Sequence, residues 1–256
     1  PPPHDSAAMG ESFGLIVAVG FVAQLVDGAL GMAYGLTATS LLLGLGYPPV
    51  IASATVHLAE TATTGVAATA HHLARNVDWA LVRRLAVAGC LGGAAGAWLL
   101  ATGLDEALQP VVSAYLALMG CLLIVRTIRR RRPRAPRRVV PLGLAGGFLD
   151  AIGGGGWGPI VSGTLVAGGS DPRRMIGSSA AAEFFVTSVV TATFAGHLGI
   201  EAFGQTALAL VIGGVPAAPL AALLVRRAPG RLLMLLVGTT IVALGVLGLW
   251  RTLGGP

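Results

Sequence analysis

Hydrophobic residues form long runs along this chain, and two of the runs are interrupted by polar and helix-breaking residues. The first covers residues 13–26, breaks at Asp27 and resumes at residues 36–45, and a second broken run covers residues 139–166. Unbroken runs follow the breaks at 49–73, 79–101, 107–128, 172–194, 202–225 and 232–250. Each unbroken run is long enough to cross about 30 Å of hydrocarbon at about 1.5 Å per helical residue, whereas each arm of the first broken run is too short. The pattern predicts two re-entrant helical hairpins, each followed by about three transmembrane helices.

The second half of the chain repeats the first at an offset of 123 residues, the separation of Asp27 and Asp150. Other equivalent pairs are Gly31 and Gly154, Tyr34 and Trp157, Gly35 and Gly158, Pro49 and Pro172, and Glu60 and Glu183. Because each half crosses the membrane an odd number of times, the two halves must have opposite orientations. The predicted fold is therefore an all-α polytopic membrane protein with two inverted-topology repeats, residues 13–128 and 139–253.

Composition supports a membrane protein and excludes other classes. Of the 256 residues, 54% are hydrophobic and only 11% are charged, which leaves too few polar residues to cover a soluble globule. A nucleic-acid-binding protein would need a basic surface on a soluble domain, and none is predicted. The two cysteines, Cys90 and Cys121, lie in apolar runs and suggest neither a disulfide framework nor a metal site.

The distribution of arginine predicts the orientation. All 17 basic residues are arginines, and the linker between the repeats, residues 129–138, is rich in them. With this linker in the cytoplasm, sixteen of the seventeen arginines lie on the cytoplasmic side and only Arg251 lies outside, as the positive-inside rule requires. The linker is also expected to contact anionic lipid head groups. Five full spans in each half would give the same sidedness, so the arginines leave open whether the hairpins re-enter or span.

Glycines dominate the second break, which runs from Asp150 to Pro159 and contains four in succession. Exposed backbone N–H groups and the positive end of a helix dipole form an anion site. Inverted repeats with broken helices are typical of secondary transporters, whose substrate site lies between the repeats. Alternatively, the glycines only permit tight turns and close packing. The predicted substrate-binding residues are Gly31, Tyr34, Gly35, Thr37, Gly153, Gly154, Gly155, Gly156, Trp157 and Gly158.

Acidic residues accompany both breaks. Asp27 and Asp150 could each cap backbone N–H groups of their own hairpin. Glu60 and Glu183 would repel an anion if ionised, so one hypothesis is that at least one is protonated during anion occupancy and couples transport to protons. The alternative is a pair of neutral, hydrogen-bonded acids that hold each hairpin to its neighbouring helix. His57 shares a helical face with Glu60 and is interpreted as a proton-relay or packing residue, since it lacks the further ligands of a metal site.

The inverted duplication and the glycine-rich stretch from Asp150 to Pro159 resemble the TauE/SafE sulfite exporter family, also called the sulfonate uptake permease family. The resemblance extends from about Phe13 to Trp250. It implies a transporter of small sulfur-containing anions, such as sulfite or the sulfonate sulfoacetate, in the inner membrane and without an organic cofactor. The first break departs from the family pattern at Leu30, Met32, Ala33 and Leu36. There the site would be lined by side chains, such as that of Tyr34, more than by backbone.

The sequence thus predicts a secondary transporter that moves a small sulfur-containing anion across the cytoplasmic membrane by alternating access. An uncoupled, channel-like facilitator for a small anion or weak acid is the alternative. An intramembrane enzyme is not expected, because motifs such as GxSxG and HExxH are missing. The expected partners are the anion, membrane lipids and, if the acids take part, protons; no cofactor, metal or nucleic acid is expected.

Overall fold

The computed structural model describes residues 6–30, 33–102, 105–129, 138–168, 172–225 and 230–253, and every element in these ranges is helical. The first half contains α1 (Ser6–Leu30), α2 (Tyr34–Gly44), α3 (Pro49–Leu73), α4 (Trp79–Ala101) and α5 (Asp105–Arg129). The second half contains α6 (Val139–Gly153), a π-helical turn η1 (Gly158–Ser162), α7 (Gly163–Gly168), α8 (Pro172–Leu198), a 3₁₀ turn η2 (Ile200–Ala202), α9 (Gly204–Val225) and α10 (Gly230–Thr252). Gly31 and residues 130–137 of the predicted linker lie outside the described residues.

The predicted runs correspond to these helices, and local sequence explains where several of them begin. Pro49 occupies the first turn of α3, where its missing N–H is not needed. The Asp78 carboxylate caps α4 by accepting hydrogen bonds from the N–H groups of Ala80 and Leu81, at 3.0 and 3.2 Å. The six unbroken runs therefore form α3, α4, α5, α8, α9 and α10.

Among the described residues, four helical segments are long and apolar enough to cross a membrane: Trp79–Ala101, Gln109–Arg129, Arg173–Leu198 and Leu235–Thr252. Shorter apolar segments are Phe13–Asp27, Val139–Gly153 and Gly204–Ala217. Helix α3 is as long as the crossing helices but carries many polar residues, among them the buried Ser53, Thr55 and His57. The polar side chains of its first half are thus directed into the protein.

The first hairpin arm contains the predicted short apolar segment, Phe13–Asp27, but its helix is longer than that segment. Helix α1 has 25 residues and begins at Ser6, whereas the apolar run begins only at residue 13. Alanine, methionine and glutamate residues before Phe13 favour helix, so the helix continues where the apolar pattern ends. The first arm of the second hairpin is too short to cross the hydrocarbon, because α6 has 15 residues and a length of about 22 Å.

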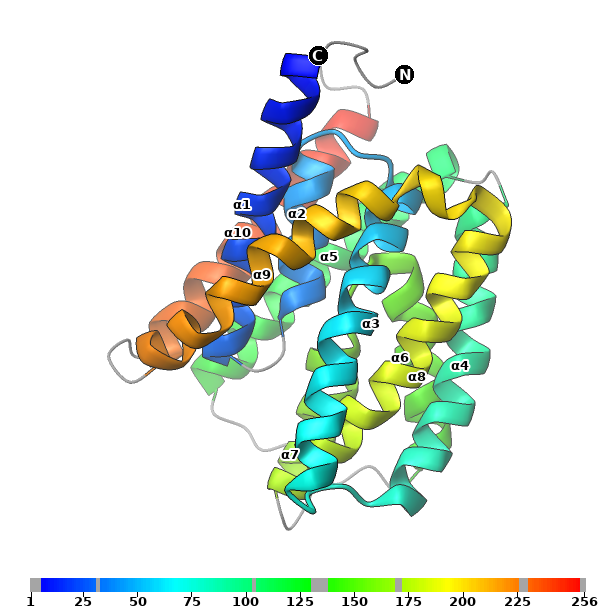
Figure 1. Ribbon diagram of the computed structural model, residues 1–256, viewed down its shortest axis with the longest axis vertical. Coiled ribbons are helices and arrows are strands. Elements are labelled where there is room, and N and C mark those ends of the chain that lie inside the picture. The colour runs from blue at the N-terminus through cyan, green and yellow to red at the C-terminus, as the bar shows by residue number, and fades with distance from the viewer. Residues whose placement is uncertain are drawn as a thin grey trace.

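The helices form two groups that face each other (Figure 1). Helices α3, α4, α6 and α8 pack together on the right of the view, and α1, α2, α5, α9 and α10 pack together on the left. The first turn of α1 and the last turn of α10 lie at the top, whereas α7 and the connection between α3 and α4 lie at the bottom. The site described below lies where the two groups meet.

Packing between the halves follows the 123-residue offset. Helix α1 packs along α9, and its equivalent α6 packs along α4, the equivalent of α9. The equivalent helices α5 and α10 pack against each other, and so do α3 and α8. Each half therefore completes its packing with helices of the other half.

Candidate functional site

The two breaks touch each other inside the protein. A Cβ on Gly35 of the first break would lie 2.7 Å from the Cα of Gly155 in the second. The Thr39 hydroxyl, one turn further along α2, donates a hydrogen bond to the Gly154 carbonyl. Gly154, Gly155 and Gly156 have φ of +64°, +147° and +153°, which side-chain-bearing residues rarely adopt. These glycines therefore serve both the turn and the close approach of the two backbones.

An aspartate caps each break in the same way. Asp27 Oδ1 accepts hydrogen bonds from the N–H groups of Ala33 and Tyr34, at 2.8 and 3.0 Å. Asp150 Oδ1 accepts one from the N–H of Trp157, at 2.8 Å. Tyr34 and Trp157 are equivalent residues, so this contact is common to both repeats. It is the capping arrangement predicted for the two aspartates.

Asp150 also contacts His57, and this contact joins α6 of the second half to α3 of the first. His57 Nδ1 lies 2.8 Å from the Ser53 carbonyl oxygen and must carry a hydrogen, because a carbonyl only accepts. His57 Nε2 lies 3.3 Å from Asp150 Oδ2, and the two side chains are 0% and 2% exposed. A hydrogen bond between these two atoms needs one proton, which either residue can supply. Ala180 takes the place equivalent to His57, so this pair occurs in one repeat only.

A cavity of about 230 Å³ lies beside the breaks. Predicted site residues that line it are Asp27, Tyr34, Gly35, Glu60, Gly156, Gly158 and Glu183. The Glu60 carboxylate accepts a hydrogen bond from the Gly35 N–H, and its Oε2 atom has no partner among the described residues. The Tyr34 hydroxyl, on a side chain that is nearly buried, also has none in this part of the chain. The cavity thus presents unused hydrogen-bonding groups next to the contact between the two breaks.

The cavity contains three carboxyl groups, those of Asp27, Glu60 and Glu183. Among its described lining residues there is no arginine, and His71 is the one side chain that can become cationic. No group of three or more His, Cys, Asp or Glu in the described ranges is arranged to hold a metal ion. An anion that enters this cavity therefore meets like charges unless the carboxyl groups are protonated.

The cavity extends from the breaks toward one end of the molecule. It is lined by the later half of α3, as far as His71, and by the first half of α8, from Ile176. Both of these half-helices lie toward the bottom of the view in Figure 1. The two breaks contribute Gly35 and Gly156 to the wall of this cavity.

Several predicted site residues lie outside the cavity wall. Trp157 is 0% exposed, and its indole N–H donates to the Ser179 hydroxyl at 3.0 Å, so it serves the core. Gly153 lies against the ring of Tyr115, where a Cβ would collide with it. The remaining predicted residues behind the wall are Thr37, His57, Asp150, Gly154 and Gly155. These residues shape the breaks and do not face the cavity.

Two residues on α5 support the second break and were missed in the sequence. The Tyr115 hydroxyl donates to the Gly155 carbonyl at 3.0 Å, and Arg126 Nη1 donates to the Pro159 carbonyl at 2.6 Å. Tyr115 lies in an apolar run and its equivalent is Gly238, so a comparison of the two repeats does not single out this tyrosine. Arg126 was interpreted only as part of the orientation signal. Gln24 and Thr63, which also line the cavity, were not predicted either.

Comparison with known proteins identifies relatives over nearly the whole chain. Residues 16–248 match the family described as "Sulfite exporter TauE/SafE". The "Probable membrane transporter protein YtnM" of Bacillus subtilis (strain 168) is 38% identical over 234 residues, which are 88% of this chain and 78% of that protein. No solved structure matches the chain. Both descriptions are those of transporters and not of enzymes.

Proposed function

Because this chain belongs to the TauE/SafE sulfite exporter family and is a multi-pass membrane transporter, we propose that it moves a small sulfur-containing anion, such as sulfite or a sulfonate, through the cavity at the two breaks. The resemblance noted in the sequence is confirmed by the family match. The observation that carries the proposal is the direct contact between Gly35 and Gly155 beside a polar cavity. A transporter needs a substrate site that each half of the protein can alter, and this contact brings both halves to one place.

The proposed architecture is a pair of inverted repeats, residues 13–128 and 139–253. Two observations support it: the equivalent packing of α1 on α9 and α6 on α4, and the matching caps made by Asp27 and Asp150. The proposed orientation places the arginine-rich linker, residues 129–138, in the cytoplasm of a cell with the protein in its inner membrane. Arg75, between α3 and α4, and Arg173 and Arg174, at the start of α8, then lie on the same side.

The proposed mechanism is alternating access. Thr64, in the later half of α3, lines the cavity. Thr187 on α8, the residue equivalent to Thr64, is 0% exposed. An exchange of the conformations of the two repeats would close the space beside Thr64 and open an equivalent one beside Thr187. The contact between the two breaks would remain at the centre and separate the two solutions.

We further propose that protons accompany the anion. Fully ionised Asp27, Glu60 and Glu183 would place three negative charges around an anion in a cavity of about 230 Å³. Two like charges 4 Å apart repel by about 4 kcal/mol at an effective dielectric constant of 20. Protonation removes this repulsion and turns a carboxylate into a donor for the anion. The free N–H groups of Gly156 and Gly158, for which no partner is found among the described residues, then add to the binding.

The transport proposal predicts saturable flux of sulfur oxyanions in proteoliposomes. Purified protein should take up one or more of sulfite, sulfoacetate, thiosulfate and sulfate, and an internal pool of the same anion should accelerate uptake of external labelled anion. Counterflow of this kind distinguishes a carrier from the channel-like alternative. Protein-free liposomes of the same lipid are the control. The proposal is wrong if no member of the panel binds or crosses, and the carrier mechanism is wrong if flux is linear with concentration and shows no counterflow.

The proton proposal predicts a change in the pH dependence of flux in Glu60→Gln and Glu183→Gln. The wild-type protein should transport faster as the pH falls, because anion entry needs a neutral carboxyl. Glutamine is permanently neutral, so each variant should carry the anion down its own gradient but should lose accumulation driven by a proton gradient. Glu201→Gln, at the exposed η2 turn, is the matched control and should behave as wild type. Unchanged pH dependence in both cavity variants would contradict coupling through these acids.

A further inference from the structure

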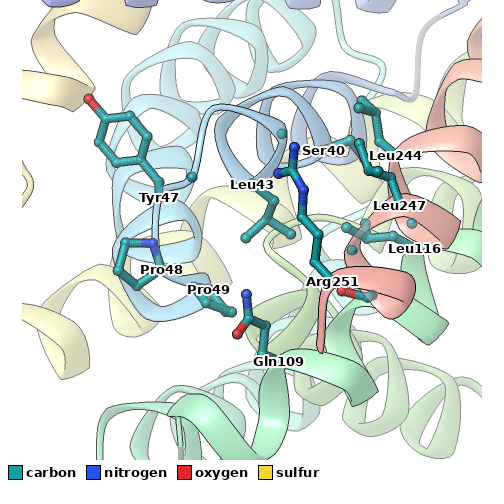
Figure 2. A pocket seen from close by; sticks show the side chains of 15 residues that line it. Ser40, Leu43, Tyr47, Pro48, Pro49, Gln109, Leu116, Leu244, Leu247 and Arg251 are labelled. Carbon is teal, nitrogen blue, oxygen red and sulfur yellow. The ribbon is translucent and has the colours of Figure 1, made fainter. Parts of the chain in front are cut away.

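A second cavity, of about 360 Å³, lies near the end of the molecule that holds the first turn of α1 and the last turn of α10. Its walls are formed by α2, α5, α10 and the turn between α2 and α3. In Figure 2 the Arg251 side chain extends from α10 into this cavity toward α2, and the Gln109 amide points into it from α5. None of the proposed transport residues described above lines it.

The polar groups of this cavity are suited to an anion. Ser40 is 1% exposed, and its hydroxyl has no hydrogen-bond partner among the described residues although it borders the cavity. Arg251 supplies a guanidinium with five N–H donors in a planar fork, a geometry that matches oxyanions. Gln109 and Ser113 supply two further side chains that can donate. Among the lining residues that the structure describes there is no carboxylate.

These polar residues do not arise from the duplication. At the 123-residue offset every one of them is matched by a residue without a polar side chain: Ser40 by Gly163, Gln109 by Leu232, Ser113 by Leu236, and Arg251 by Ile128. Arg251 is also the single arginine that the predicted orientation places outside. An arginine against the positive-inside rule, together with three polar side chains unmatched in the other repeat, indicates a feature that belongs to one side of the membrane.

Helix α2 links this cavity to the cavity of about 230 Å³ beside the two breaks, which is called the transport cavity below because of the proposed function. Tyr34 and Gly35 at its beginning line the transport cavity, whereas Ser40 and Leu43 line the second cavity. Between them, the Thr39 hydroxyl holds the Gly154 carbonyl of the other break. The second cavity therefore lies behind the closed contact, on the side from which an anion would arrive in the opposite conformation.

We propose that the second cavity is an anion-binding vestibule on the extracytoplasmic side, in which Arg251, Ser40 and Gln109 hold a small oxyanion. The ligand class is a sulfate, sulfonate or related group with several oxygens on one centre, because the Arg251 fork and the Ser40 hydroxyl can then bind different oxygens at once. Its role as an entry or exit station rests on the proposed function; the binding itself does not. Anion binding in this vestibule is independent of the three carboxyl groups of the transport cavity.

The vestibule can be tested with a cysteine reporter in purified protein in nanodiscs. Leu247, which lines the cavity from α10, is changed to cysteine after Cys90 and Cys121 have been replaced by alanine. Rates of modification are measured with an anionic and a cationic methanethiosulfonate reagent. The anionic reagent should be favoured, and Arg251→Gln should lower the ratio of the two rates about 10-fold, because the reagents differ by two charges near one guanidinium. Arg231→Gln, at the other end of the same helix, should leave the ratio unchanged.

Protection by anions tests the site itself. Sulfate or methanesulfonate should slow modification of Leu247→Cys, Ser40→Ala should weaken this protection while keeping the charge preference, and Arg251→Gln should abolish both. Absence of protection by either anion, or protection that survives Arg251→Gln, would overturn the proposal. The measurement needs no transport, so failure of the vestibule and failure of the proposed function give different results: the first leaves flux in proteoliposomes intact, the second leaves protection intact.

Discussion

Replacing Asp150 by alanine is expected to destabilise the protein strongly and to abolish transport. The change leaves the Trp157 N–H and His57 Nε2 without partners in a fully buried region. Each buried polar group left without a hydrogen bond costs about 1–3 kcal/mol, so the free energy of unfolding should fall by about 2–6 kcal/mol. The cap of the second break is lost at the same time, and Gly155 would no longer be held against Gly35. Thermal denaturation in detergent and flux in proteoliposomes measure the two effects.

Asp150→Asn separates the two roles of this residue. The asparagine oxygen can still accept from Trp157, and its amide can donate to His57 Nε2, so the folded structure should be kept. What is lost is the option of moving the proton between residue 150 and His57. If Asp150 acts only as a cap, Asp150→Asn should be stable and should transport with the pH dependence of the wild type. Stability near that of Asp150→Ala would contradict the hydrogen-bonding scheme itself.

The duplicated features of this protein were the ones that its sequence could reveal. Asp27 and Asp150 are identical residues at equivalent positions, and the structure gives them the same bond to residues 34 and 157. Two inverted repeats would bring their hairpins to the middle of the membrane from opposite sides, so a contact between the breaks is consistent with the predicted duplication. The apolar pattern did not predict where α1 begins, because this helix begins at Ser6, seven residues before the pattern starts.

Features present in only one repeat could not be predicted in this way. Tyr34 and Trp157 are equivalent aromatic residues, but Tyr34 faces the transport cavity whereas Trp157 is buried against Ser179. Under the proposed alternating access, the two repeats are in different conformations, and the equivalent of the cavity wall at Trp157 is then closed. The bond from Tyr115 to Gly155 and the pair of His57 with Asp150 depend on packing between halves, which a single repeat does not encode.

This difference between equivalent residues leads to an expected result for a matched pair of cysteines. Thr64 lines the open cavity from α3, and its equivalent Thr187 on α8 is 0% exposed. Thr64→Cys should react with a membrane-impermeant thiol reagent from the cytoplasmic side, whereas Thr187→Cys should be at least about 10-fold slower from either side in this conformation. In the opposite conformation the order should reverse, and Thr187→Cys should react from outside. Rates in inside-out vesicles and intact cells, lacking Cys90 and Cys121, measure both.

The pair is informative because the two variants carry the same change at equivalent positions of the two repeats. Both are threonine-to-cysteine changes four residues after an equivalent glutamate, Glu60 or Glu183. A shift in the population of the two conformations, imposed by an anion gradient of either direction, should change the two rates in opposite senses. Leu253→Cys, 78% exposed at the end of α10, should react at a constant rate and controls for orientation. If Thr64→Cys and Thr187→Cys change in the same sense, the repeats do not exchange conformations, and the cavity beside Thr64 is a fixed pore entrance.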